Sequence, residues 1–291
     1  MGTVISFLIG NQGDWPDTWP PFGEDDSVGP SKTNTPHTPT ERDVLDVKKT
    51  LMDHLPLELV DVVLDDAEYW PVLICHNEST PARSIAAMSF PLHNASYCYF
   101  ISPKVPETSY LDGSRFKVRK ILFRICSRDQ GWGGDPGLTD PYAGSWTWFE
   151  AAIIRGLGGE AFVNEPDAVA RQIQGSSVLP PASNAPSDTP DASPGPLQVL
   201  HPFNRTRVWM LQRNLRANRE EALHEVAWTN ADDDSAKKDT NEVLDKSGTG
   251  TGYGFVRSLE PGDRIAVYAR AQYPGWVNHV RGVEIQIFYS A

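Results

Sequence analysis

The chain has 291 residues, which fits one large domain or two small ones, and its 26 basic and 38 acidic residues give a net charge of −12. This balance excludes a strongly basic nucleic-acid-binding domain, and we expect no nucleic-acid partner. The three cysteines, Cys75, Cys98 and Cys126, are too few for a disulfide framework, and their long spacings fit no zinc site.

The first residues carry an acylation motif. Met1-Gly2-Thr3-Val4-Ile5-Ser6 fits the pattern for N-myristoylation at Gly2. A single acyl chain holds a membrane weakly, and the residues that follow are acidic, so we expect at most weak membrane association through an acylated Gly2. The alternative is an apolar stub that packs on the domain or stays loose. No stretch is long enough to span a membrane or resembles a signal peptide, which predicts a cytoplasmic protein, with the nucleus as the alternative.

Residues 1–39 are predicted to form a disordered tail. Between residues 11 and 39 the chain is rich in Pro, Gly, Asp, Ser and Thr and has little periodicity. Three aromatic residues stand out in this segment, Trp15, Trp19 and Phe22. They either cluster locally or dock onto a partner or the body of the protein, and the sequence leaves these alternatives open.

A helical segment is predicted over residues 40–75. Thr40 and Asp43 resemble a capping box with Asp in place of the usual Glu, and apolar residues follow at helical spacing. Pro56 suits the first turn of a second helix over residues 56–67, because an N–H there would have no helical partner. Apolar residues form a broad stripe on this helix, namely Leu57, Leu59, Val60, Val63 and Leu64.

From about residue 83 the apolar pattern changes to that of strands. For example, Ile121, Phe123 and Ile125 are expected on one face of a strand. Strands are predicted over residues 117–126, 145–154, 208–214, 224–228, 264–271 and 283–289. Pro261-Gly262-Asp263 has the residue types of a turn that leads into the strand at 264. Short strands separated by turns predict a β-sandwich or jelly roll.

One mainly β domain is therefore expected over residues 83–291, with a flexible insertion at 176–196. That insertion consists mainly of Ser, Pro, Ala and Asp and supplies no apolar surface to bury. A short helix is expected before it, at 165–175, and a second, acidic insertion at 232–245. The predicted fold is a β-sandwich preceded by a short helical segment and a disordered tail.

Candidates for ligand binding lie in blocks that combine Trp with Arg, Asn or Gln at strand ends and in loops. β-Sandwich domains keep their binding sites at such positions. An aromatic ring covers the apolar face of a sugar while amide and guanidinium groups bond its hydroxyls, so this mixture suits a glycan. The candidates are Arg128, Asp129, Trp132, Asn214, Trp276 and Asn278. The alternative is structural, with the arginines paired to Asp129 or Glu150 and the tryptophans in the core.

Other chemistries have little support in the sequence. The glycine-rich run at 248–254 lacks the Lys-Ser/Thr ending of a phosphate loop, which favours a glycine-rich hairpin or a mobile loop. The histidines are scattered at spacings that fit no metal site, so neither a metal nor a cofactor is expected. No serine stands in a nucleophile elbow, and only Asp129 and Glu150 offer carboxylates within the aromatic blocks.

The run Leu55-Pro56-Leu57-Glu58-Leu59, followed by an apolar helix, resembles the opening of an F-box. Residues 65–71 are similar to the version found in filamentous-fungal proteins. In those proteins the F-box is accompanied by a galactose-binding-like β-sandwich, which the blocks at 127–132, 145–148 and 261–278 resemble. The resemblance implies docking to a Skp1-type adaptor of a ubiquitin ligase, through a face made by Leu55, Pro56, Leu59 and Leu64.

The function predicted from these observations is that of a non-enzymatic binding protein. Its sandwich would recognise a glycan or glycoprotein, and its helices would connect it to the ubiquitin-ligase-type partner. The first alternative is a lectin-like or structural module whose helices pack on the sandwich. A helical stripe that is exposed favours the partner, and one that is buried favours this alternative. The second alternative is a hydrolase that acts on glycans.

Overall fold

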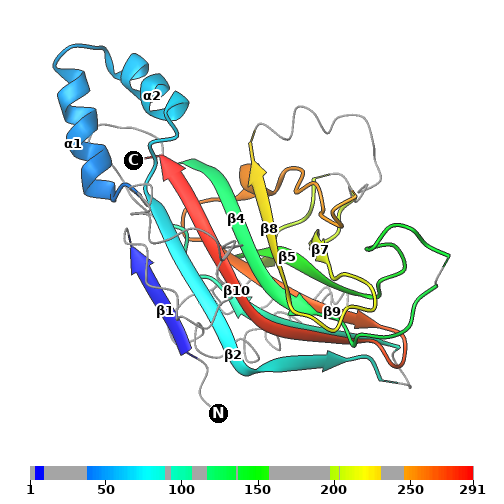
Figure 1. Ribbon diagram of the computed structural model, residues 1–291. Coiled ribbons are helices and arrows are strands. Elements are labelled where there is room, and N and C mark those ends of the chain that lie inside the picture. Colours follow the sequence, from blue (N-terminus) through cyan, green and yellow to red (C-terminus); the bar gives the residue numbers. More distant parts are fainter. Residues whose placement is uncertain are drawn as a thin grey trace, which may run out of the picture.

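The computed structural model describes residues 4–9 (backbone), 38–88, 93–106, 117–135, 137–156, 197–202, 204–230 and 246–290. Two antiparallel sheets account for most of this part (Figure 1). Sheet A has the strand order β1 (Val4–Ile9), β2 (Val72–Ala86), β10 (Val277–Ser290), β4 (Lys117–Arg128) and β8 (Ala222–Thr229). Sheet B has the order β3 (Asn94–Ile101), β9 (Arg264–Gln272) and β5 (Thr147–Arg155), and the far edge of β5 pairs with both β6 (Leu197–Gln198) and β7 (Trp209–Arg213).

The two sheets pack face to face around one apolar core. Ile121, Phe123 and Ile125 of β4 are fully buried on the inner face of sheet A, as their alternation predicts. Phe149 and Ile153 of β5 are buried against them from sheet B. The predicted fold class is confirmed at the level of a mainly β protein with a β-sandwich.

All six predicted strands are present in the described part of the chain, which also contains β1, β2, β3 and β6. The predicted boundary at residue 83 is wrong, because β2 already begins at Val72, within the segment predicted to be helical. Its first residues, from Val72 to Cys75, are all buried. A strand covered on both faces has a continuous apolar run, and such a run does not show the alternation that identifies strands.

The prediction of a disordered tail over residues 1–39 is wrong for residues 4–9. These residues form β1, which pairs antiparallel with β2 in a register that joins Val4 to Glu78 and Ile9 to Leu73. Pairing satisfies the backbone groups of an otherwise open edge of sheet A. Gly2 and the aromatic residues Trp15, Trp19 and Phe22 lie outside the described residues. So do the expected short helix at 165–175 and the insertions at 176–196 and 232–245.

The predicted helices form an antiparallel hairpin of α1 (Glu41–Met52) and α2 (Leu57–Asp66). The capping box is confirmed, because the Thr40 side chain accepts from the Asp43 N–H and the Asp43 carboxylate accepts from the Thr40 N–H. Val44 of α1 packs against Val60 and Leu64 of α2. No helix in the described part of the chain is long and apolar enough to cross a membrane.

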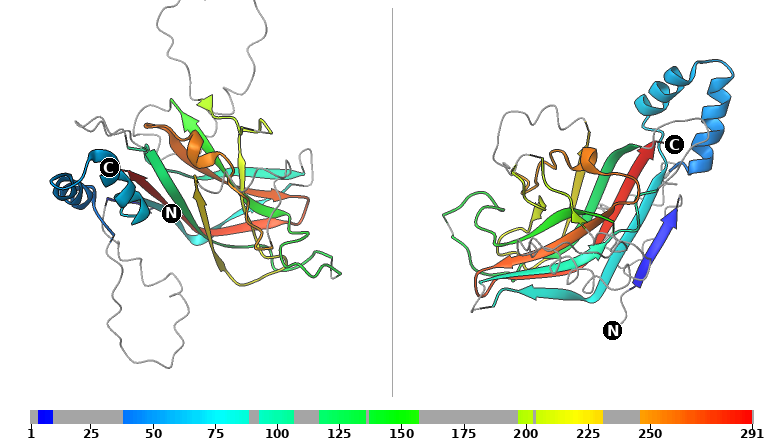
Figure 2. Two further views of the ribbon diagram at one scale, coloured as in Figure 1. Left: turned by 90° about the horizontal axis from the view of Figure 1, so that it is seen from above. Right: turned by 180° about the vertical axis from the view of Figure 1, so that it is seen from behind.

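The helical hairpin and the turn between β9 and β10 lie at opposite ends of the sandwich (Figures 1 and 2). Two ion pairs connect the helical segment to the start of β4. Arg119 pairs with Asp65 of α2 at 2.7 Å, and Lys120 pairs with Glu68, just after α2, at 3.4 Å. β10 has 14 residues and connects the two ends, a distance of roughly 40 Å at ~3.3 Å per residue.

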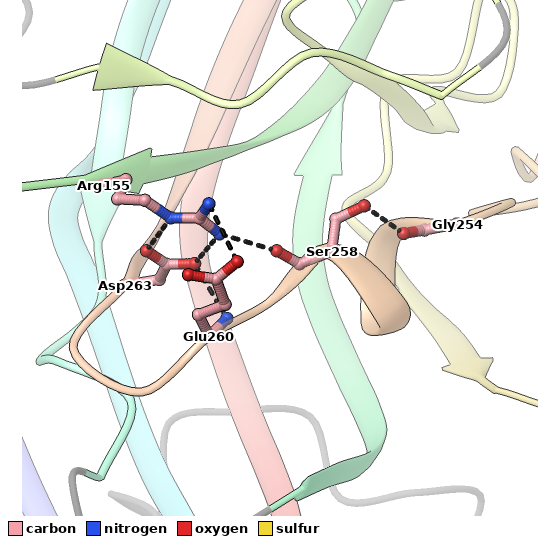
Figure 3. A network of polar contacts seen from close by, with 5 residues as sticks. All are labelled: Arg155, Gly254, Ser258, Glu260 and Asp263. Atoms are coloured by element: carbon pink, nitrogen blue, oxygen red, sulfur yellow. Dashed lines mark hydrogen bonds and ion pairs between the residues drawn. The ribbon is translucent and has the colours of Figure 1, made fainter.

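The turn before β9 has the geometry that its residue types predict. The N–H of Asp263 donates to the carbonyl of Glu260 at 3.1 Å, and Gly262 has φ +84° at the third position. The buried Asp263 carboxylate accepts two hydrogen bonds from Arg155, both at 2.9 Å (Figure 3). Arg155 also donates to the carbonyl of Ser258, at the end of the short helix α5 (Phe255–Ser258), at 3.0 Å. This network joins the end of β5 to the start of β9.

The glycine-rich segment 248–254 packs closely on the core, which favours a packed loop over a mobile one. Gly252 has φ +65°, and a Cβ at this position would lie 2.2 Å from the indole of Trp228. A Cβ at Gly250 would lie 2.0 Å from the carbonyl oxygen of Met210. The Trp228 indole donates to the Gly250 carbonyl at 3.0 Å. These glycines therefore allow the backbone to approach the core.

Glu284 of β10 is expected to make stability depend on pH. Its side chain is 1% exposed on the outer face of sheet A, and this burial raises its pKa to about 7 against the contacts to Gln286 and Arg124, which lower it. The pKa of this carboxyl group is near 4.5 in the unfolded chain and about 7 in the folded protein. The stabilisation by the protonated group is therefore complete below pH 4.5 and is lost as the pH rises through about 7. Relative to Glu284→Gln, the wild type should lose roughly 3 kcal/mol between pH 4.5 and 8, measured by urea unfolding. A difference between the two proteins that stays constant with pH would contradict this.

Candidate functional site

Four aromatic residues gather at the end of the sandwich opposite the helices. Trp132 is 59% exposed, Tyr273 42% and Trp146 37%, and Trp276 is half-buried. The rings of Trp146 and Tyr273 meet edge to face with centroids 4.6 Å apart. We call Trp132, Trp146, Tyr273 and Trp276 the aromatic tip. Large apolar rings this exposed contribute little to the core, so the tip is the first candidate for a binding surface.

The structure brings together two of the sequence blocks that carry the predicted ligand-binding residues. Gln130, after β4, accepts from the N–H of Val277 at 3.2 Å and donates to the carbonyl of Trp132 at 2.5 Å. A Cβ at Gly275 would lie 3.1 Å from the Trp132 indole, so this ring lies over the turn between β9 and β10. Trp132 and Trp276, separated by 144 positions in the sequence, are thereby held on one surface.

Asn214 and Asn278 do not face a ligand, and this part of the prediction is wrong. Both side chains are fully buried between the sheets. The Asn214 amide donates to the Asn278 side-chain oxygen and to the Thr147 hydroxyl, each at 2.9 Å, and accepts from Ser127 at 2.7 Å. Asn278 donates to two backbone carbonyls, those of Trp148 and Arg270. The two amides cross-link the ends of four strands beneath the tip.

Asp129 is also buried, so the prediction that it faces a ligand is wrong. Its two carboxylate oxygens accept from the N–H groups of Gly131 at 2.7 Å and Ala217 at 2.5 Å. Burial raises the pKa of Asp129, and these backbone hydrogen bonds and the charge of Arg128 oppose the shift. The carboxylate therefore holds the loop after β4 against the loop after β7. It positions Trp132, and its oxygens are occupied by backbone donors.

Glu150 and Arg270 form the pair that the structural alternative expects. The guanidinium of Arg270 donates to one carboxylate oxygen of Glu150 at 2.7 Å and 2.6 Å, and the Trp148 indole donates to the other at 2.8 Å. Trp209 and Trp228 fill the core, as the same alternative predicts for part of the tryptophans. The paired-carboxylate arrangement of a glycosidase thus has no support from Asp129 and Glu150.

Polar residues line the outer face of sheet A beside the tip. The hydroxyl of Ser84 lies 2.8 Å from Nδ1 of His279, and His279 lies opposite Arg128 in the register of β10 and β4. Burial lowers the pKa of His279, and the charge of Arg128 lowers it further. The lowered pKa favours the neutral imidazole, and Nε2, the ring nitrogen that Ser84 does not contact, can bond a neutral polar ligand. Arg128 is half-exposed at this position, as a ligand-binding role requires.

Sequence reasoning missed two arginines in the loop after β7. The Arg219 side chain lies on Gly131, where a Cβ would be 2.2 Å from its Cγ, and Arg216 lies on Gly134, where a Cβ would be 2.4 Å from its Cδ. The two arginines thus flank the loop that presents Trp132. One signal could have found them, because Arg213, Arg216 and Arg219 recur at every third position in a segment without a helical pattern.

The helical face predicted to contact a partner is exposed in part. Leu64 is buried against Val44 and Leu55 is partly buried beside it, so the inclusion of Leu64 is wrong. Pro56 and Leu59 are exposed. The apolar residues on the outer side of α2 are Leu59, Val62 and Val63, exposed by 51%, 53% and 43%. At spacings of three and four residues they form one stripe opposite the contact with α1.

Metal ligands and thiols are two further kinds of group that could carry chemistry. No group of three or more His, Cys, Asp or Glu in that part of the chain is placed to hold a metal ion. The three cysteines are buried thiols, and burial raises the pKa of Cys126 to about 12, which keeps it protonated at neutral pH. No protein-family model, curated protein or solved structure matches this chain.

Proposed function

We propose that this protein is a non-enzymatic binding protein whose aromatic tip recognises a glycan. The exposure of Trp132, Tyr273 and Trp146 on a rigid support is the observation that carries the proposal. Three polar side chains at the adjoining ends of β4 and β10 can bond hydroxyl groups, namely Arg128, Gln130 and His279. Stacking an aromatic ring on the C–H face of a sugar while polar groups bond its hydroxyls is the chemistry that such a surface offers.

The buried support beneath the tip agrees with a binding role. Binding sites need side chains held by packing and by hydrogen bonds behind them. The Asn214–Asn278 pair and the Asp129 carboxylate provide this by fixing three loops with buried hydrogen bonds. We also propose that the sandwich is of the galactose-binding-like jelly-roll type, which the blocks of Trp with Arg and Asn suggest by resemblance.

A glycan array with the wild-type chain tests this proposal, and Trp132→Ala locates the binding. The proposal predicts a set of bound glycans, with the affinity for the best of them lowered by ~1–3 kcal/mol in Trp132→Ala. Trp70→Ala, at the opposite end of the sandwich beside the helices, is the matched control and should bind as the wild type does. A blank array, or equal binding by Trp132→Ala, would contradict the proposal.

A second function is supported by the exposed stripe on α2. We propose that Leu59, Val62 and Val63 contact a Skp1-type adaptor, because an exposed stripe fits a partner better than a purely structural helix. Acidic residues border the stripe, Glu58 and Asp66 among them. The stripe and the tip lie at opposite ends of the sandwich, so one chain would be able to hold adaptor and ligand together.

Charging the stripe tests the adaptor contact. Leu59→Asp should abolish co-purification with a Skp1-type adaptor, because a buried unpaired carboxylate would oppose an apolar interface. Leu45→Asp, at a comparably exposed apolar position on α1, is the control and should retain the adaptor. Both variants should keep the thermal unfolding of the wild type, since both positions are exposed. Wild-type protein that retains no adaptor would end this part of the proposal.

A further inference from the structure

We infer that the ligand of the tip is an acidic sugar, a pyranose that carries a carboxylate or sulfate group. This inference rests on the proposed function and names the class of glycan that the site selects. It comes from three arginines around Trp132, namely Arg128, Arg216 and Arg219. Within the residues that the structure describes, none of their guanidinium groups has a carboxylate oxygen within 4.0 Å.

Five arginines elsewhere on the sandwich are paired with acidic side chains. Arg119 pairs with Asp65, Arg124 with Glu225 and Glu284, Arg155 with Asp263, Arg270 with Glu150 and Arg281 with Glu221. The chain has 38 acidic residues for 26 basic ones, so unpaired arginines do not reflect a shortage of carboxylates. Among the described residues Arg83, Arg205 and Arg213 also lack such a pair, but Arg128, Arg216 and Arg219 lie together in the loops beside the exposed indole that would stack on a sugar.

The hydrogen bonds of these arginines leave most of their donors free. Arg216 donates to two backbone carbonyls, those of Ala143 and Leu138, while Arg128 donates to the carbonyl of Asp129. Arg219 makes one long contact, 3.4 Å, to the carbonyl of Gly131. Each guanidinium has five N–H groups, so the carbonyls orient the arginines without neutralising them.

Three acidic residues in the same loops point their carboxylates at the backbone, and Glu221, in the loop after β7, pairs with Arg281. The Asp129 oxygens accept from Gly131 and Ala217, as described above. Asp135 accepts from the N–H of Gly137 and Asp140 from that of Tyr142, both at 2.8 Å. These carboxylates shape the turns and leave the arginines available to a ligand. A planar guanidinium matches the two oxygens of a carboxylate or sulfate, and the indole covers the ring that carries this group.

Isothermal titration calorimetry with three tetrasaccharide probes tests the inference. The probes are tetragalacturonate, its fully methyl-esterified form, and a sulfated galactotetraose, all in buffer of low ionic strength. We expect the acidic form to bind about tenfold or more tightly than the ester, because charge-assisted hydrogen bonds are stronger than neutral ones. Higher salt should weaken the acidic form and leave the ester unchanged. Binding of the sulfated probe instead of the galacturonate identifies sulfate as the anionic group.

The variants assign this preference to the arginines. Arg219→Gln removes an exposed charge and should lower the affinity for the bound acidic probe about fivefold or more, with the ester unaffected and thermal unfolding unchanged. Arg42→Gln in α1, 90% exposed, is the matched control. Equal affinity for acid and ester would overturn the inference while leaving the proposed glycan binding intact. Binding of none of the three probes, or an acid preference that survives Arg219→Gln, would also overturn it, and the glycan array then decides the proposed function separately.

Discussion

Asp263→Ala is expected to lower the free energy of unfolding by about 3 kcal/mol. The Asp263 carboxylate is 1% exposed and accepts from Arg155 twice and from the Glu260 N–H once (Figure 3). Its removal leaves buried donors without acceptors at the junction of β5, α5 and β9. Arg155 is 35% exposed and can recover part of its hydration, which places the effect at the lower end for buried ion pairs.

Glu260 provides the matched control for this network. It pairs with the same guanidinium at 3.0 Å, but its side chain is 62% exposed. Glu260→Gln should therefore change the stability by less than about 1 kcal/mol, because exposed ion pairs contribute little. Urea unfolding of both variants measures the difference. An Asp263→Ala variant as stable as Glu260→Gln would show that the network does not hold the two strands together.

Trp209→Ala is expected to destabilise the protein by about 3–5 kcal/mol, whereas Trp132→Ala should cost less than about 1 kcal/mol. Trp209 is 1% exposed, its ring meets Phe255 edge to face at 5.0 Å, and its indole donates to the Tyr253 carbonyl at 2.8 Å. Trp132 is 59% exposed. Removal of the Trp209 indole leaves a cavity and an unpaired Tyr253 carbonyl. Removal of the Trp132 indole exposes little new surface.

Thermal and urea unfolding of the two tryptophan variants separate core from tip. If Trp132→Ala were as unstable as Trp209→Ala, the exposed indole would be part of the fold and its loss would not report on binding. The half-buried Trp276 lies between these cases, so an affinity change in Trp276→Ala is interpretable only with its unfolding curve beside it.

Much of the fold could be predicted from the sequence because it depends on local patterns. Alternation in β4 and β5, the Thr40 cap and the Pro261-Gly262 turn are each determined within a few residues. The start of β2 was missed because residues 72–75 are buried on both faces and have no alternation to detect. β1 was missed because a short apolar run becomes a strand only when an open edge, here that of β2, is available to pair with it.

The candidate site could be predicted in its location but not in its composition. Blocks of Trp, Arg and Asn at strand ends indicated the loops that carry the candidates, and in the structure Gln130 joins two of these loops. Local sequence does not show whether an amide at a strand end faces water or another amide. The side chains of Asn214 and Asn278, 64 positions apart in the sequence, form a hydrogen bond with each other. Only the packing of the two sheets against each other buries them.

Fluorine NMR of the 5-fluorotryptophan-labelled protein tests the central claim most directly. The chain has nine tryptophans, and single substitutions assign their resonances. Titration with the best glycan from the array should shift the resonances of Trp132, Trp146 and Trp276 and leave those of the core residues Trp209 and Trp228 unchanged. Shifts confined to tryptophans outside the aromatic tip, or no shift at saturating glycan, would contradict the claim that the tip is the binding surface.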